Sequence, residues 1–117
     1  MTLVSGWHLP SDAEWQKLID FVGGASTAGT KLKATSGWSY EGKSGNGTDE
    51  FDFSALPGGF GNLIGEFSHV GYLGYWWSAT EYDADYAYSR YMGNNEGVYR
   101  YNYYKGSDLF SVRCLQD

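Results

Sequence analysis

The stretch YWWSATEYDADYAYSRYMGNNEGVYRYNYY, residues 75–104, decides the fold because it contains strand-like runs separated by turns. Tyr75 to Thr80 is an aromatic run that we expect to form a buried strand, followed by a turn from Glu81 to Asp85. Two further runs follow, and the turn Gly93-Asn94-Asn95-Glu96-Gly97 joins them. The sequence therefore predicts a mostly antiparallel sheet in this region.

Two apolar residues, Met92 and Val98, fix which side chains of the later strands face the core. Successive strand residues point to opposite faces, so Tyr88, Arg90, Arg100 and Asn102 share the inward face with them. The outward set is Ala87, Ser89, Tyr91, Tyr99, Tyr101 and Tyr103. Because an unpaired buried charge is costly, we expect both inward arginines to be paired with acids or carbonyls.

A helix is expected upstream of the sheet. Ser11-Asp12-Ala13-Glu14 has the spacing of a capping box, and Pro10 keeps the preceding residue extended. The apolar side chains that follow recur at helical spacing, and Gly23-Gly24 supplies a stop. They are Trp15, Leu18, Ile19 and Val22. The predicted helix runs from about Asp12 to Val22.

The rest of the chain carries weaker signals. Residues 29–34 suggest a short helical or irregular piece, and the Gly-, Ser- and Asn-rich residues 36–49 predict a loop. Alternation around Phe51 and Phe53 predicts a brief extended segment, and alternation of Phe110, Val112 and Cys114 predicts a closing strand. The fold class is thus α+β, with one helix, a mostly antiparallel sheet and long loops.

Size and charge narrow the possible functions. A chain of 117 residues makes a single domain, residues 1–117. The net charge of −6 repels phosphate backbones, so nucleic acid is not an expected partner. No apolar run approaches the roughly 18 residues of a membrane span, so no membrane insertion is expected of this chain. Cys114 stands alone, which excludes an internal disulfide; we expect it to be a small buried residue.

Catalytic chemistry finds little support. His8 and His69 have no Ser or Cys nucleophile motif around them. The oxygen-bearing residues of the loop 46–52 lack the spacing of an EF-hand, so a solvated acidic loop is expected instead of a metal site. We therefore expect no enzyme activity, no catalytic residue, no metal and no cofactor.

Tyrosine composition points instead to recognition. Ten of the eleven tyrosines fall between Tyr72 and Tyr104, and nineteen of the twenty-seven residues from Tyr82 to Asp108 are Tyr, Asn, Asp, Ser or Gly. Antibody-type binding surfaces use this mixture, because tyrosine gives a large contact area at low cost in rotamer entropy. Strand tyrosines can also be purely structural, but only one β-branched residue, Val98, accompanies these.

Three ordered blocks give the chain a resemblance. Gly6 to Trp15, Gly71 to Tyr82 and Phe110 to Cys114 resemble the Fibrobacter succinogenes major paralogous domain family. That family is similar to the formylglycine-generating-enzyme branch of the C-type lectin-like fold. The resemblance implies a C-type lectin-like domain that is extracellular, displayed on a bacterial cell surface or on a phage. The cysteine that many members carry before the Gly-Trp pair is absent, and the single Cys114 cannot supply the paired-thiol centre of that enzyme branch.

Related C-type lectin-like proteins include the variable proteins of diversity-generating retroelements, and residues 82–108 resemble their randomised regions in composition. We therefore predict a ligand-binding domain for a protein or cell-surface macromolecule. The alternatives are a carbohydrate-binding adhesin module that needs no metal, and a structural module that self-associates. The predicted binding residues are Tyr82, Asp83, Asp85, Tyr86, Ser89, Tyr91, Asn94, Asn95, Tyr99, Tyr101, Tyr103 and Tyr104.

Overall fold

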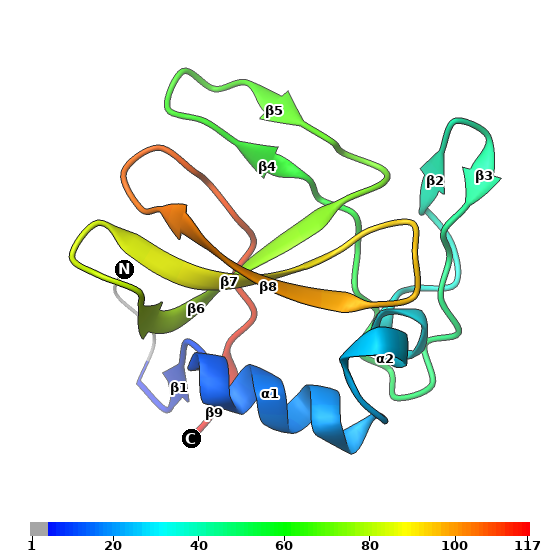
Figure 1. The fold of residues 1–117 in the computed structure, drawn as a ribbon, viewed down its shortest axis with the longest axis horizontal. Helices are drawn as coiled ribbons and strands as arrows, with labels where there is room; N and C mark the ends of the chain where they lie inside the picture. Colours follow the sequence, from blue (N-terminus) through cyan, green and yellow to red (C-terminus); the bar gives the residue numbers. More distant parts are fainter. Residues whose placement is uncertain (1–4) are drawn as a thin grey trace.

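A three-stranded antiparallel sheet forms the centre of the molecule (Figure 1). Its strands are β6 (Gly74–Glu81), β7 (Tyr86–Met92) and β8 (Val98–Tyr104), with β7 in the middle. The computed structural model describes residues 5–117. Met92 pairs with Val98 across β7 and β8, so these two apolar side chains share one side of the sheet. The three predicted strands and the turns between them are confirmed.

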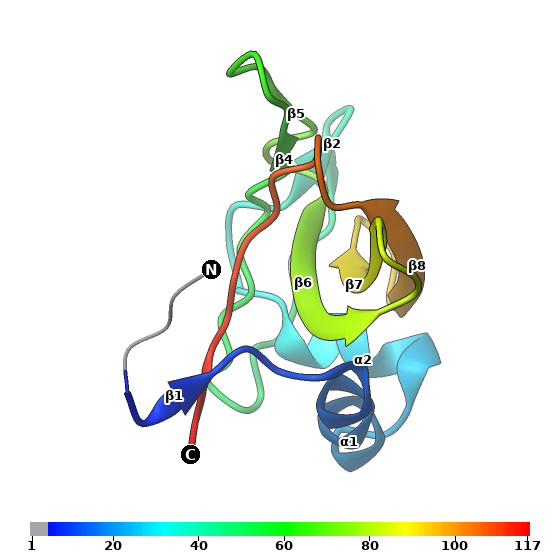
Figure 2. The same ribbon diagram turned by 90° about the vertical axis from the view of Figure 1, so that its left-hand side faces the viewer.

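Two helices cover that side of the sheet, α1 (Asp12–Phe21) and α2 (Ala25–Leu32) (Figures 1 and 2). The predicted capping box starts α1: the Ser11 hydroxyl accepts from the Glu14 amide at 3.1 Å, and the Ser11 amide donates to the Glu14 carboxylate at 3.1 Å. The second helix begins at Ala25, before the piece suggested by residues 29–34. The fold thus has two helices where the strong signal predicted one, and the short helical piece suggested by residues 29–34 overlaps the second half of α2.

The core lies between the helices and the sheet. Trp15 of α1 packs on Trp76 of β6, with ring centroids 6.4 Å apart. The indole of Trp38 donates to the Ala55 carbonyl at 2.9 Å, which ties the long middle loop to the core. The buried apolar cluster comprises Trp15, Ile19, Val22, Ala28, Leu32, Trp38, Ala55, Trp76, Met92 and Val98.

Two small hairpins interrupt the middle of the chain. The predicted loop 36–49 contains β2 (Ser39–Tyr40) paired with β3 (Lys43–Ser44). Further on, β4 (Phe60–Gly61) pairs with β5 (Phe67–Ser68) in a hairpin that projects away from the helices (Figure 2). Each of these strands is only two residues long, and an alternating pattern cannot be recognised in so short a stretch of sequence.

The segment around Phe51 and Phe53 is not extended, so that prediction was wrong. Asp52 and Ser54 have φ of 56° and 53°, and the Asp49 carboxylate accepts hydrogen bonds from the amide and hydroxyl of Ser54. Hydrogen bonds from a short polar side chain to nearby groups favour such a turn over a strand. Phe53 nevertheless packs against the core, whereas Phe51 is exposed.

The two ends of the described chain meet. β1 (Trp7–His8) pairs with β9 (Leu115–Gln116), which lies after the closing strand predicted over residues 110–114. That prediction was wrong: the segment touches β6 only through a bridge between Ser111 and Trp76. Further along the same edge of β6, the Ala79 amide donates to the Pro10 carbonyl at 2.7 Å. That position is therefore not available to the C-terminal segment, which leaves the sheet. Cys114 in this segment is partly buried.

Candidate functional site

Both arginines that were predicted to point inward lie on the helix-facing side of the sheet, but the Arg100 side chain is 53% exposed, so burial was predicted correctly for Arg90 alone. Arg90 is buried and its Nε donates to Asp12 Oδ1 at 3.0 Å, while Arg100 donates to Asp12 Oδ2 at 3.0 Å. Gln16 also accepts from Arg90. The expected pairing with an acid is therefore confirmed. One carboxylate at the start of α1 thus bridges two strands, which assigns these charges to the scaffold.

The opposite side of the sheet carries what we call the tyrosine face: Tyr75, Tyr91, Tyr99, Tyr101 and Tyr103. Tyr75, Tyr91 and Tyr99 follow one another across the three strands, with ring centroids 5.5 and 5.3 Å apart. Tyr101 lies 5.3 Å from Tyr103 along β8. The predicted row Tyr99, Tyr101 and Tyr103 lies on the face that the strand phasing assigns to it, and Tyr99 and Tyr101 are 39% and 59% exposed.

Small residues of the central strand are covered on this face. Ser89 lies in register between Trp77 and Tyr101, is 0% exposed, and contacts the Tyr101 carbonyl. Ala87 is also buried, opposite Tyr103. Large rings on both flanking strands shield a small central side chain, so the predicted accessibility of Ser89 was wrong.

Five other predicted residues form a separate group, which we call the turn cluster: Tyr82, Asp83, Asp85, Tyr86 and Tyr104. Tyr86 pairs with Tyr104, and the two-residue period puts both on the side of Met92 and Val98, not on the tyrosine face. Asp83 caps the turn by accepting from the amides of Asp85 and Tyr86, each at 2.9 Å. The predicted binding residues are therefore divided between two sides of the sheet.

Asn94 and Asn95 lie at the other end of the sheet, where they brace loops. The side-chain amide of Asn94 donates to the Lys43 backbone carbonyl at 3.1 Å, and the backbone carbonyl of Asn95 accepts from Lys33 Nζ at 2.8 Å. Lys33 is only 1% exposed, also donates to the Gly93 carbonyl, and burial lowers the pKa of its amine. Lysine is rarely buried, so the sequence offers no signal for this anchor.

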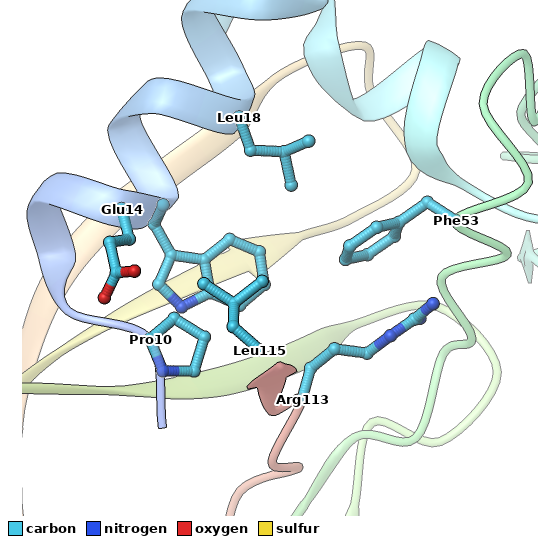
Figure 3. Close-up of a pocket in the computed structure, with 7 residues that line it drawn as sticks. Pro10, Glu14, Leu18, Phe53, Arg113 and Leu115 are labelled. Atoms are coloured by element: carbon cyan, nitrogen blue, oxygen red, sulfur yellow. The ribbon is translucent and has the colours of Figure 1, made fainter. Parts of the chain in front are cut away.

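A pocket of about 180 Å³ opens beneath α1 (Figure 3). Leu18 of α1, Phe53 of the middle loop and Leu115 of β9 converge on it, and Arg113 lies under the Phe53 ring at 3.9 Å from its centroid. Glu14 stands at its rim, engaged by the capping box. Trp15 also lines the pocket, and its buried indole Nε1 has no hydrogen-bond partner among the described residues. The apolar walls formed by Leu18 and Phe53 pack against the core.

A smaller pocket, of about 80 Å³, lies at the edge of the tyrosine face, and we call it the aromatic pocket. Four rings and one carboxylate line it: Phe60, Tyr75, Tyr103, Phe110 and Asp108. Only Tyr103 belongs to the predicted set. The other four residues come from a hairpin, a strand and the C-terminal segment, so their meeting depends on the tertiary fold and has no sequence signal.

The histidines lie apart from any nucleophile-like arrangement among residues 5–117. The ring nitrogens of His8 lie 2.9 Å from Glu14 and 2.6 Å from Asp117, and these hydrogen bonds raise the pKa of His8. His69 stacks on Phe60, with centroids 5.1 Å apart. Within the described part of the chain, no group of three or more His, Cys, Asp or Glu side chains is placed to hold a metal ion. No helix there is long and apolar enough to cross a membrane.

Comparison with known proteins identifies the family. No curated protein and no solved structure matches the chain. A family model described as the Fibrobacter succinogenes major domain matches residues 5–116, nearly the whole chain, and its bounds enclose both β1 and β9. The chain therefore belongs to the Fibrobacter succinogenes major domain family.

Proposed function

We propose that this chain is a C-type lectin-like binding domain that recognises a protein or another cell-surface macromolecule through its tyrosine face. The observation that carries the proposal is the exposure of Tyr99 and Tyr101, at 39% and 59%, on a sheet surface with neighbouring rings in support. Exposed aromatic clusters mark interaction sites, and tyrosines are frequent hot spots of interfaces. The paired chain ends and the helices on one side of the sheet support the C-type lectin-like architecture.

The tyrosine face contains two exposed rings and partly buried rings that pack against them. Tyr91 and Tyr103 are partly buried and hold the rings of Tyr99 and Tyr101 in place. A preorganised aromatic surface loses little side-chain entropy on binding, which favours affinity. Tyr86 and Tyr104 of the turn cluster lie on the other side of the sheet, so the proposal assigns the ligand to the tyrosine face alone.

The test is a double substitution, Tyr99→Ser with Tyr101→Ser. Arrays of immobilised glycans and of purified cell-surface proteins serve as probes, and sedimentation of the purified protein reports self-association. Tyr104→Ser is the matched control, because Tyr104 is 45% exposed but lies on the helix-facing side. We expect the double variant to lose binding by at least about tenfold while the control keeps it, since hot-spot tyrosines contribute about 2 kcal/mol each. Equal binding and equal oligomeric state of all three proteins would refute the proposal.

A carbohydrate-binding adhesin and a self-associating module remain the alternatives, and the same experiment separates them. Loss confined to the glycan array favours the adhesin, and loss of a dimer in sedimentation favours self-association. A surface or phage location and diversification of residues 82–108 by a retroelement belong to the proposal as well. A near-identical repeat that differs from codons 82–108 mainly at adenines would support diversification, and its absence would favour a fixed ligand.

A further inference from the structure

The aromatic pocket combines neutral rings with one acidic group. Tyr75 and Phe110 stack at 4.9 Å with an interplanar angle of 23°, and Tyr103 stands at 90° to Tyr75 and at 85° to Phe110. Phe60 meets Tyr75 edge-on at 5.4 Å. Rings set at right angles to one another wall a small space from several directions. The face of an aromatic ring carries partial negative charge, which attracts a cation.

Asp108 supplies the only formal charge of this pocket. Burial raises the pKa of Asp108, as expected for a carboxylate that loses water without gaining a partner. Among residues 5–117 its side chain makes no hydrogen bond or ion pair, because Lys105 pairs with Glu81 at 3.1 Å and Arg113 stacks on Phe53. Burial also raises the pKa of Tyr75 and of Tyr103, so both phenols are neutral at physiological pH. The pocket therefore has a negative charge that nothing in the described chain neutralises.

The size of the pocket limits what can enter it. A volume of about 80 Å³ is roughly that of three liquid water molecules, at about 30 Å³ each. A sugar ring is larger than this space. A metal ion requires several oxygen ligands, and a hard cation would lose too much hydration among aromatic rings. A weakly hydrated organic cation fits both the size and the charge.

We propose that the aromatic pocket binds the alkylammonium group of a ligand, with the four rings around the cation and Asp108 as its counter-ion. Aromatic cages recognise quaternary ammonium groups in this way. The inference deepens the proposed function, on which it rests, because Tyr75 and Tyr103 belong to both sites. It names the chemistry of one contact at the edge of the tyrosine face, where the Tyr103 ring lies 5.3 Å from the Tyr101 ring between centroids.

The experiment compares choline with dimethylbutanol, the neutral isostere in which a carbon replaces the charged nitrogen. Each is titrated into the full chain at constant ionic strength, and the aromatic side-chain NMR signals of the pocket report binding. We expect choline to bind at least about tenfold more tightly than dimethylbutanol, since shape is shared and only the cation is attracted by rings and carboxylate. Equal affinities, or no shift of these signals with choline, would overturn the proposal.

Substitutions then test whether Asp108 supplies the charge that attracts choline. Asp108→Asn is expected to weaken choline binding by about tenfold and to leave dimethylbutanol binding unchanged. It should not impair folding, because the carboxylate has no partner to lose, and a urea unfolding curve verifies this. Asp85→Asn, in the exposed turn cluster, is the matched control and should bind choline as the wild type does. Wild-type affinity of Asp108→Asn for choline would refute the assignment.

Two sources of the cation are distinguished by a peptide that carries one trimethyllysine. Binding of this peptide as tight as that of choline indicates a protein ligand, and binding of choline alone indicates a choline-bearing headgroup. The Tyr99→Ser, Tyr101→Ser variant separates this inference from the proposed function. If it binds choline normally but no macromolecule is bound by either protein, the pocket stands and the proposed function fails. If the double variant loses macromolecular binding while choline binds neither protein, the proposed function stands and the pocket assignment fails.

Discussion

At the scale of single residues, Asp12 joins three elements of the fold through its two carboxylate oxygens. It sits in the first turn of α1, where negative charge is favoured by the helix dipole, and its two carboxylate oxygens engage Arg90 and Arg100. Arg100 also lies over the Tyr88 ring at 4.8 Å. A single carboxylate therefore fixes the helix, the central strand and the edge strand β8 relative to one another.

We expect Asp12→Asn to destabilise the domain by about 3–5 kcal/mol, because it leaves the buried Arg90 guanidinium without a counter-charge. Urea unfolding monitored by tryptophan fluorescence measures the change. Asp20→Asn is the control, since Asp20 lies exposed on the same helix and bonds only Gln16 at 2.9 Å; it should change stability by less than about 0.5 kcal/mol. A similar small loss for both variants would contradict the role of Asp12.

At the scale of elements, the close packing of α2 on the β7–β8 turn explains a glycine in a helix. A Cβ at Gly29 would collide with the backbone carbonyls of Gly97 and Glu96, the latter at 2.8 Å. The Thr30 amide donates to the Glu96 carbonyl at 3.1 Å, which holds the turn against the helix. The helix and the turn that joins β7 and β8 therefore form one packed unit.

Gly29→Ala tests this unit through the sign of its effect. In an exposed helix, alanine in place of glycine stabilises by about 1 kcal/mol. Here the collision with backbone atoms should reverse the sign and destabilise by about 1–3 kcal/mol. Thermal unfolding followed by circular dichroism gives the answer, and a stability gain would show that α2 and the turn can separate without cost.

Elements with a strong local signal were predictable from the sequence, and elements that depend on distant contacts were not. The capping box and apolar stripe fixed α1, and Met92 and Val98 fixed the facing of β7 and β8. Strand β9 was misplaced because the Pro10 carbonyl occupies the hydrogen-bonding position on β6 that a longer closing strand would need. The accessible part of the tyrosine face followed from the two-residue period, whereas the covering of Ser89 and the aromatic pocket follow from rings that are distant in sequence.

At the scale of the whole molecule, His8 connects the two ends of the described chain. It lies in β1, contacts Asp117 just after β9, and contacts Glu14 in the first turn of α1. Hydrogen bonds to Glu14 and then to Asp117 raise the pKa of His8 above its ordinary value of 6.5, and the bond from His8 lowers the pKa of Glu14 below its ordinary 4.5. These contacts are strongest when His8 is protonated and Glu14 is ionised.

The pH dependence of stability follows from these directions. Because the folded-state pKa of His8 is raised, its contribution is fully present below pH 6.5 and is lost as the pH rises through that higher pKa. The Glu14 contribution is present above pH 4.5 and is lost as the pH falls through its lowered pKa. From about pH 5.5 to about pH 8.5, the free energy of unfolding should therefore fall more in the wild type than in His8→Gln. Parallel decreases in the two proteins would contradict this role for His8.

The pairing of β1 with β9 makes this domain suited to insertion as a cassette. Trp7 lies opposite Gln116, and the Asp117 amide donates to the Gly6 carbonyl at 2.9 Å, so residues 6–7 and 116–117 lie side by side on paired strands. A surface loop of a host protein can accept such a domain without parting its own ends, as a hairpin turn would be accepted. The two linkers to the host protein would then lie next to each other, and the inserted domain would display the tyrosine face outside the host fold.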